Sequence, residues 1–367
     1  MNKICINASN LQGGGGVQVA VSFLYKLSES KEYASTINVV VSSVVSIELS
    51  KLNVQVNNFA SYKVFNCYGF ECAFKTWPNY EVIFTIFGPF YSFFYRGKSI
   101  VGFAQPWIIG DLKDMKKTHS FLLFYKLRLK FFIQRVIFAL NSTEFIVEAD
   151  FVKDALYKDS LYISKKIHIV SNSISQIFHE TSNWESVKLP KKSSLVLGYL
   201  GKNYAHKNTK LFPEIILFLR DKFGIHLDIF VTFSDEEWDS CSSIFRQHVT
   251  NIGPITIKQC PNFYMSVDGV ISLSLLECFS VLPLEAIFMR RPLFLSDRRF
   301  HKDIALNYAT YVDPLSVEDI SNKIFNYYFS QEINKNLIDK DRGHDYINSL
   351  PSASDRFSNY IKILKDS

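Results

Sequence analysis

Two glutamates, Glu277 and Glu285, stand eight positions apart in LLECFSVLPLEAI, residues 275–287. Pro283 suits the first turn of a helix and Pro292 ends one, so we expect Glu285 in a first helical turn and Glu277 in the loop before it. Such carboxylates can simply complement the helix dipole or be solvated. The stretch around them is apolar, however, and a buried carboxylate needs a partner. A ligand rich in hydroxyl groups, such as a sugar or a ribose, is a suitable one.

Four consecutive glycines, 13–16, precede a helical pattern that starts near Val17. Glycine accepts positive φ and lets a ligand approach the backbone, and a helix start offers unpaired N–H groups. A phosphate or another anion would gain from these donors and from the helix dipole. The spacing matches neither a dinucleotide fingerprint nor a P-loop. A tight strand-to-helix turn without a ligand is the alternative.

Short apolar segments alternate with helical patterns along the chain and supply the elements that would position these residues. We expect strands at 3–8, 37–45, 81–87, 99–104, 144–149 and 166–172, and, after the polar stretch 179–194, at 195–201, 226–233, 255–260, 268–273, 292–297 and 310–314. This order predicts an α/β fold of two Rossmann-like domains with mostly parallel sheets. Ligands bind such sheets beyond the carboxyl ends of the strands, and we expect the site in a cleft that the two domains face.

Composition excludes several classes of protein. The six cysteines show no zinc-ligand spacing, which favours reduced core thiols in a cytosolic protein, and no cluster of acidic residues suggests a metal. No apolar run reaches the length of a membrane span, and the apolar run at the N-terminus is too short for a signal peptide. We expect domains at 1–185 and 190–350.

The basic excess lies in the first half of the chain. Residues 1–190 hold 20 Lys and Arg against 14 Asp and Glu, whereas residues 191–367 hold 21 of each. Much of the excess falls in the stretch 113–135, where Phe, Leu and Tyr alternate with Lys and Arg. This mixture suits a helix at an anionic membrane surface, and a core-packed helix with a solvated basic face is the alternative. No recognition motif for nucleic acid accompanies it.

The stretch 274–297 resembles the E-x7-E region of retaining glycosyltransferases of the GT-B fold, particularly glycosyltransferase family 4. The family pattern S-L-x-E-x-F-G-x-P-x-x-E-A is followed by a proline and a strand ending in S-D. The resemblance implies that Glu277 contacts the donor sugar as a catalytic residue and that Glu285 holds the ribose hydroxyls. Phe279 and Ser280 fall at donor-binding positions, with Ser280 in place of the usual glycine.

Other motifs follow in the family's order and extend the resemblance over most of the chain. LGYLGKNYAHKN, residues 197–208, resembles the donor-domain loop whose cations meet the diphosphate, which implies that role for Lys202 and Lys207. The ammonium groups of two lysines are mobile point charges, which suit two phosphates on physical grounds as well. The resemblance places the backbone of Gly14, Gly15 and Gly16 at the diphosphate and the acceptor. The resemblance also implies that a closing helix, about 352–367, crosses back to the first domain.

Two departures from the family pattern concern the acceptor side and the donor phosphates. Gln105 stands where many members have an active-site histidine; it can hydrogen-bond a sugar hydroxyl but cannot titrate. We place Gln105 and Asn172, from the motif KIHIVSNSIS, on the acceptor or sugar side. Residues 298–302 lack the usual G-G-x-x-E and offer cations that either replace backbone donors or face solvent: Arg298, Arg299, His301 and Lys302.

The resemblance implies a retaining, metal-independent transfer from a nucleotide sugar, which is a substrate, with no cofactor. We expect a glycan acceptor, lipid-linked as in O-antigen or capsule assembly, and a cytoplasmic protein bound peripherally at the inner face of the membrane. Two alternatives are a GT-B-fold nucleotide-sugar epimerase and an inactive donor-binding scaffold. The sequence does not specify the sugar.

Overall fold

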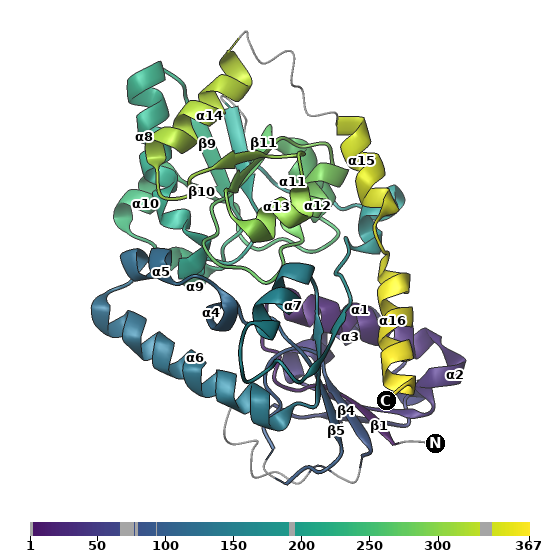
Figure 1. The fold of residues 1–367 in the computed structure, drawn as a ribbon. Coiled ribbons are helices and arrows are strands. Elements are labelled where there is room, and N and C mark those ends of the chain that lie inside the picture. Colours follow the sequence, from purple (N-terminus) through teal and green to yellow (C-terminus); the bar gives the residue numbers. More distant parts are fainter. Residues whose placement is uncertain (1–2, 67–76, 78–79, 93, 191–194, 331–339) are drawn as a thin grey trace. The chain divides into compact units, whose positions relative to one another are not determined.

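The computed structural model describes residues 3–66, 77, 80–92, 94–190, 195–330 and 340–367 (Figure 1). The chain divides into two compact units. The first comprises Met1–Asp111, Phe121–Asn172 and Pro351–Ser367, and the second comprises Leu112–Ser120 and Ser173–Leu350. Apart from the segment Leu112–Ser120, the chain passes from the first unit to the second after Asn172 and returns to the first at Pro351. Two of the cysteines, 67 and 72, lie outside the described residues.

A seven-stranded parallel sheet forms the centre of the first unit, in the order β3-β2-β1-β4-β5-β6-β7. Its strands are β1 (Ile4–Ala8), β2 (Ile37–Val41), β3 (Ser61–Val64), β4 (Val82–Thr85), β5 (Lys98–Gly102), β6 (Glu144–Val147) and β7 (Lys166–Ile169). The strand order reverses between β1 and β4, so the loop that follows β1 opens at the point where α/β sheets bind ligands. That loop carries the glycine run.

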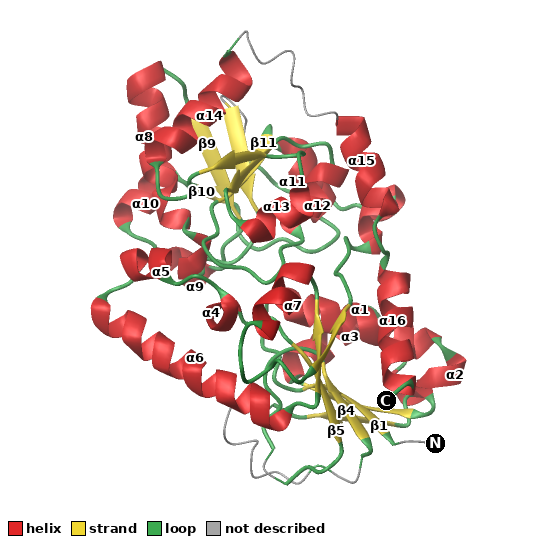
Figure 2. Cartoon of the chain, viewed as in Figure 1, coloured by secondary structure: helices red, strands yellow, loops and turns green. Residues whose placement is uncertain are grey.

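Helices cover both faces of this sheet (Figure 2). They are α1 (Gly15–Glu29), α2 (Lys31–Ala34), α3 (Ser43–Lys51), α4 (Pro106–Ile109), α6 (Phe121–Asn141), α7 (Asp150–Tyr157) and α16 (Ala353–Lys365). The closing helix α16 packs on α1 within this unit, where the Tyr360 ring meets Phe23 edge to face at 5.3 Å. Ser352 and Asp355 form a capping box that fixes where α16 begins.

A six-stranded parallel sheet forms the centre of the second unit, in the order β10-β9-β8-β11-β12-β13. Its strands are β8 (Leu195–Tyr199), β9 (Leu227–Val231), β10 (Thr250–Asn251), β11 (Gly269–Ser272), β12 (Leu293–Ser296) and β13 (Thr310–Val312). The order reverses between β8 and β11. The loops after these two strands therefore lie side by side, and they are the loops that carry Lys202, Lys207 and Glu277.

Apolar clusters fill both faces of the second sheet. The helices of this unit are α5 (Lys113–Thr118), α8 (Phe212–Phe223), α9 (Asp235–Asp239), α10 (Ser243–His248), α11 (Cys260–Ser266), α12 (Leu282–Phe288), α13 (Arg299–Ala305), α14 (Val317–Phe329) and α15 (Lys340–Ser349). Across the part of the chain that the structure describes, no helix has both the length and the apolar character of a membrane span.

The predicted α/β class with two parallel sheets is confirmed, two predicted strands were wrong in extent or type, and two strands were missed. The run 37–45 is a strand only as far as Val41, because Ser42 caps α3 with its side chain and starts a helix. Residues 255–260 form a turn that leads into α11 rather than a strand, and β10 lies earlier, at Thr250–Asn251. Strand β3 was not predicted; its side chains are half-buried or exposed.

Candidate functional site

The loop between β11 and α12 positions Glu277 in the second unit. The Leu275 N–H donates to the His206 carbonyl at 2.7 Å, and the Ser296 hydroxyl donates to the Ser274 carbonyl at 2.6 Å. These bonds tie the loop to the 3-10 turn Ala205–Lys207 that follows β8 and to the end of β12. Glu277 is therefore held in place by the segments that follow or end the two neighbouring strands as well as by its own loop.

Lys207 and Glu277 form an ion pair at this point. Lys207 Nζ donates to Glu277 Oε1, and the two side chains are only 20% and 9% exposed. Burial raises the pKa of Glu277, but the charge and the hydrogen bond of Lys207, together with the smaller effects of His206 and His301, outweigh burial, and the net pKa lies below the usual value. Glu277 is thus an ionised carboxylate whose counter-ion comes from the 3-10 turn Ala205–Lys207.

Neutral polar groups surround the ion pair. Burial lowers the pKa of His206 to about 4, although the charge of Glu277 opposes this effect. Burial and the nearby Glu277 raise the pKa of Tyr199 well above its usual value, so its hydroxyl stays protonated and donates to the Lys202 carbonyl at 3.1 Å. The side chain of Lys202 itself is exposed.

Glu285 lies in the first turn of α12, as Pro283 predicted, and is 5% exposed. Its Oε2 accepts a hydrogen bond of 2.7 Å from the Tyr264 hydroxyl on α11. Burial raises the pKa of Glu285 to about 7, and the Tyr264 hydrogen bond only partly offsets this. The two glutamates thus differ: Glu277 has a lysine partner, whereas Glu285 has a phenol. Phe279 and Ser280, between them, are half-buried.

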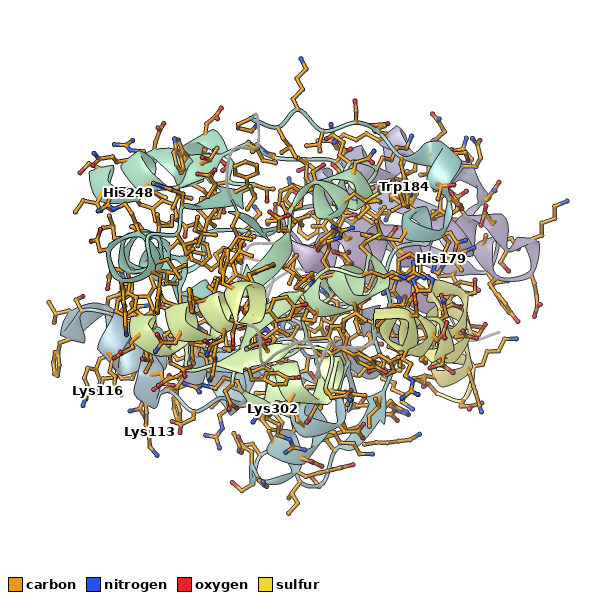
Figure 3. The ribbon with its side chains drawn as sticks, turned by 90° about the horizontal axis from the view of Figure 1, so that it is seen from above. Lys113, Lys116, His179, Trp184, His248 and Lys302 are labelled. Atoms are coloured by element: carbon orange, nitrogen blue, oxygen red, sulfur yellow. The ribbon has the colours of Figure 1, made fainter. Side chains whose placement is uncertain are left out.

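The cations expected from residues 298–302 are engaged within this unit. Arg298 pairs with Asp114 of α5 at 2.5 Å, Arg299 with Asp303 at 3.2 Å, and Lys302 with Asp297 at 2.5 Å (Figure 3 labels Lys302). His301 is fully buried and not a cation, because burial lowers its pKa to about 4. Among the described residues, no three His, Cys, Asp or Glu side chains gather as ligands for a metal.

The glycine run of the first unit forms the start of α1, which begins at Gly15 rather than near Val17. Gly14 is the N-cap residue with φ of 72°, a left-handed conformation that favours glycine. None of the described side chains caps this helix end. A Cβ on Gly15 would meet no atom within 4 Å, whereas one on Gly16 would approach Leu11 at 3.2 Å. Packing therefore does not explain why residue 15 is a glycine.

The two residues expected on the acceptor side lie in different surroundings of the first unit. Gln105 is the half-buried N-cap residue of α4. The Asn172 amide oxygen accepts a hydrogen bond from Arg356 of α16, and Asn172 also bonds Glu148. Glu148 is buried next to Arg356, and burial raises its pKa to about 7, with Arg356 opposing. Asn172 is thus part of a buried polar cluster.

Several residues of these sites were not predicted. Glu148 follows the apolar strand β6 directly, and an acidic side chain at the carboxyl end of a parallel strand is a signal that could have found it. Tyr264 precedes β11 on an apolar helix, where nothing in the sequence distinguishes it from a core residue. His301 was predicted only as a cation.

Comparisons with known proteins agree with this architecture. No family model matches the sequence. The O-antigen chain mannosyltransferase RfbU of Salmonella typhimurium is 22% identical over 241 residues, which span 63% of this chain and 60% of that protein. The match therefore covers less than two thirds of the curated relative.

Solved structures match this chain over nearly its whole length, and three examples follow. They are a glycosyltransferase from Rickettsia africae (TM-score 0.65, 12% identity, 100% of this chain and 98% of that one), HepE of Anabaena in complex with UDP-glucose (0.63, 10%, 100% and 100%) and sucrose-phosphate synthase from Thermosynechococcus elongatus (0.65, 11%, 100% and 99%). The two parallel sheets and these likenesses agree, and the chain has the two-domain α/β architecture of the GT-B fold.

Proposed function

We propose that this chain is a retaining glycosyltransferase that moves a sugar from a nucleotide donor to a glycan acceptor. The observation that supports this most strongly is the largely buried Lys207–Glu277 pair in the loops that follow β8 and β11, with buried Glu285 on the next helix. Buried charges are costly to maintain, so an ionised carboxylate and an ammonium held together here favour a ligand site over a purely structural role.

The donor chemistry follows from the residues of the second unit. The Lys207 ammonium has three N–H donors, and the bond to Glu277 uses one of them. The others can bind oxygens of the departing diphosphate, together with the exposed Lys202. The ionised Glu277 accepts hydrogen bonds from sugar hydroxyls and favours positive charge on the sugar ring. Glu285 accepts hydrogen bonds from the ribose.

In this proposal, a transfer that retains the configuration of the sugar needs no basic side chain on the acceptor side. The diphosphate leaves, and the acceptor hydroxyl enters, on the same face of the sugar. The leaving phosphate oxygen takes the proton of that hydroxyl, so a residue that cannot titrate, such as Gln105, is compatible with turnover. Stabilising the charge of the leaving group and positioning the reactants are the main contributions of the protein, and lysines serve them without a metal.

The glycine run gives the first unit a site of its own. The N–H groups at the start of α1 can donate to a phosphate or a hydroxyl, because Gly14 and Gly15 present the backbone without side chains. We keep Gly14, Gly15 and Gly16 as residues that bind donor or acceptor oxygens, and Gln105 as a residue that contacts a sugar hydroxyl.

The helix α6 carries a stripe of exposed apolar side chains. They are Phe121, Leu122, Tyr125, Leu129, Phe132, Ile133 and Leu140, each at least 40% exposed. At 100° per residue these side chains fall on one side of the helix, opposite the buried Phe124 and Phe138, whereas Leu123, which is 45% exposed, lies outside the stripe. Lys126 and Lys130 border the stripe on one side, with Arg128 on the other. In Figure 1, α6 lies along the edge of the first unit.

An anionic membrane surface is the partner that fits this stripe. Apolar side chains enter the headgroup region while the flanking cations meet anionic lipid. A core-packed helix would instead bury its apolar side chains, and most of those on α6 are not buried. We therefore propose peripheral attachment at the inner membrane face and a lipid-linked glycan as acceptor. The O-antigen function in the name of the Salmonella relative agrees with such an acceptor.

A two-stage experiment tests the function. Thermal-shift measurements with UDP-, GDP-, dTDP- and ADP-sugars identify the donor, because a ligand that binds only the folded state raises the melting temperature. Transfer of the labelled sugar to lipid-linked glycan is then measured for the wild type, E277Q and E285Q. The matched control is E214Q, at an exposed glutamate of α8. We expect loss of transfer in the first two variants only.

Three results would contradict the proposal. Transfer that persists in both E277Q and E285Q would remove the site assignment. Conversion of the donor to its epimer without any acceptor would indicate a nucleotide-sugar epimerase. Donor binding with no turnover on any lipid-linked glycan would indicate an inactive scaffold.

A further inference from the structure

One polar atom near Glu277 is buried without a partner. His301 of α13 is 0% exposed, and among the described residues no hydrogen-bonding group pairs with its Nε2. Buried polar atoms in folded proteins nearly always have a partner. The proposed function gives this atom no role, because it uses Glu277, Glu285 and the lysines.

The partners of the other ring nitrogen determine what Nε2 can bind. The Ser296 hydroxyl has one hydrogen, which it donates to the Ser274 carbonyl at 2.6 Å. At 2.9 Å from His301 Nδ1, the same hydroxyl oxygen must therefore accept a hydrogen bond from the ring. The Ser296 carbonyl, 3.3 Å from Nδ1, accepts as well. Nδ1 thus carries the proton, and Nε2 presents a lone pair.

The ring stays in this neutral form at physiological pH. Burial lowers the pKa of His301 to about 4, against the opposing charge of Glu277 and the bond to the Ser296 carbonyl. A neutral ring with a protonated Nδ1 can only accept at Nε2. A diphosphate oxygen, which also only accepts at neutral pH, is therefore no partner for this atom. A hydroxyl group is one.

Hydrogen bonds connect His301 to the loop that carries Glu277 and indicate which hydroxyl group it could bind. One hydroxyl, that of Ser296, contacts both the His301 ring and the carbonyl of Ser274, which begins the loop that carries Glu277. The charge of Glu277 also acts on the ring. We propose that His301 is a specificity-determining residue whose Nε2 accepts a hydrogen bond from a hydroxyl of the donor sugar bound beside Glu277. This inference rests on the proposed function and adds a residue that reads the sugar.

Two substitutions at this position separate the ligand contact from the structural one. Asparagine in H301N can keep the contact with Ser296 but does not reach the position of Nε2. Glutamine in H301Q can place an amide oxygen near that position. H226N is the matched control, because His226 is exposed on the same unit. The melting temperature of each variant without ligand shows whether it folds.

Affinities are measured by titration calorimetry with two ligands: the nucleotide sugar found for the wild type and the nucleoside diphosphate it contains. We expect H301N to bind the nucleotide sugar about tenfold more weakly and the diphosphate as well as the wild type does, since one hydrogen bond is lost. H301Q should recover most of the sugar affinity, and H226N should behave as the wild type. A series of donors that each lack one sugar hydroxyl should contain one that binds the wild type more weakly than the complete donor does. H301N should bind that deoxy donor as well as it binds the complete donor.

The outcomes that overturn the inference are distinct from those that overturn the function. If H301N weakens both ligands equally, His301 supports the fold or the phosphates and does not read the sugar. If H301N changes neither affinity, Nε2 holds a water. Either result leaves the glycosyltransferase proposal standing. If the wild type binds no nucleotide and no nucleotide sugar, the proposed function falls, and the inference falls with it.

Discussion

Lys207 donates a hydrogen bond to Glu277, and the two residues stand 70 positions apart in the sequence. The pair lies where β8 and β11 are neighbours, at the reversal of strand order in the second sheet. Because both side chains are largely withdrawn from water, each is the main compensation for the charge of the other. Lys207 therefore holds the carboxylate in place in addition to any role at the diphosphate.

Removing one member of this pair should destabilise the protein more than removing both. In K207M the buried Glu277 carboxylate loses its counter-ion, and we expect the free energy of unfolding to fall by about 3 kcal/mol. The double variant K207M/E277Q leaves no unpaired charge and should recover most of that loss. Transfer of the sugar should be absent from both variants. Urea denaturation measures the stability, and equal losses in the single and double variants would show that the pair is not coupled.

A matched control for this pair is available on the surface of the same unit. Lys222 and Glu318 form an ion pair of 3.0 Å, with side chains 44% and 65% exposed. K222M should change the free energy of unfolding by about 0.5 kcal/mol or less, because exposed pairs contribute little. A loss in K222M as large as that in K207M would mean that the substitution to methionine, and not the ion pair, causes the effect.

The buried carboxyl of Glu285 should make stability depend on pH. Its pKa is raised to about 7 in the folded protein, so the folded state binds the proton more tightly than the unfolded state does. The resulting stabilisation is complete at acidic pH and is lost as the pH rises through 7. E285Q has no charge to bury and should exceed the wild type in stability by up to about 3 kcal/mol at pH 8, and match it near pH 4.

The proposed ribose role predicts the opposite effect of this variant on ligand binding. E285Q should bind the nucleotide more weakly than the wild type, although its free form is more stable at pH 8. Denaturation curves at pH 4 and 8 and titration with the nucleoside diphosphate measure the two effects. Glu148, whose pKa is also raised to about 7, is present in both proteins and cancels in the comparison. A variant that is less stable than the wild type at pH 8 would contradict the prediction.

The sequence predicted the fold and the loops of the site because both follow from local patterns. Pro283 and the apolar run before it place Glu285 in the first turn of α12. The pairing of Lys207 with Glu277 depends on which strands are neighbours, and the composition of single strands does not specify that order. The hydrogen bond from Tyr264 to Glu285 joins two helices that each resemble ordinary core elements.

The differences between prediction and structure have identifiable physical causes. The segment 255–260 alternates like a strand, but the Gln259 side chain accepts a hydrogen bond from the Thr256 N–H at 2.9 Å and closes a turn, and α11 then begins at Cys260 with Pro261 in its first turn. The cations near the end of β12 were expected at the ligand or in solvent. Each arginine and lysine there has a carboxylate partner, which the sequence did not indicate because one of the partners, Asp114, is distant in sequence; Arg299 and Lys302 are also exposed, as the solvent alternative expected.

Substitutions in the glycine run test whether each glycine is needed for the backbone conformation or for a ligand. Gly14 has φ of 72°, so G14A should destabilise the protein by about 1 kcal/mol or more. Gly15 is the first residue of α1, and a methyl group there meets no atom within 4 Å, so G15A should leave stability unchanged or raise it by about 0.5 kcal/mol. If ligand oxygens approach Gly15, G15A should nevertheless lower sugar transfer.

Thermal denaturation and transfer rates of the two variants distinguish the explanations. A G15A protein that is stable and fully active would indicate that the run is a tight turn without a ligand, which was the alternative at the outset. A G15A protein that is stable but impaired would support an oxygen ligand at the start of α1. G14A serves as the reference variant, because its loss of stability is expected to come from backbone strain alone.

The exposed stripe of α6 predicts a graded loss of membrane binding. K126Q/K130Q should weaken binding to vesicles that contain anionic lipid by about 1 kcal/mol per cation, and added salt should mimic this change. L122S/L129S should also weaken binding, because these side chains are 81% and 62% exposed and supply apolar contact. The control is K116Q/K117Q on α5, which belongs to the second unit (Lys116 is labelled in Figure 3). Co-sedimentation with vesicles of anionic and of purely zwitterionic lipid measures all three. An unchanged bound fraction in both α6 variants would show that this stripe serves another partner, whereas an equal loss in the α5 control would extend the binding surface beyond α6.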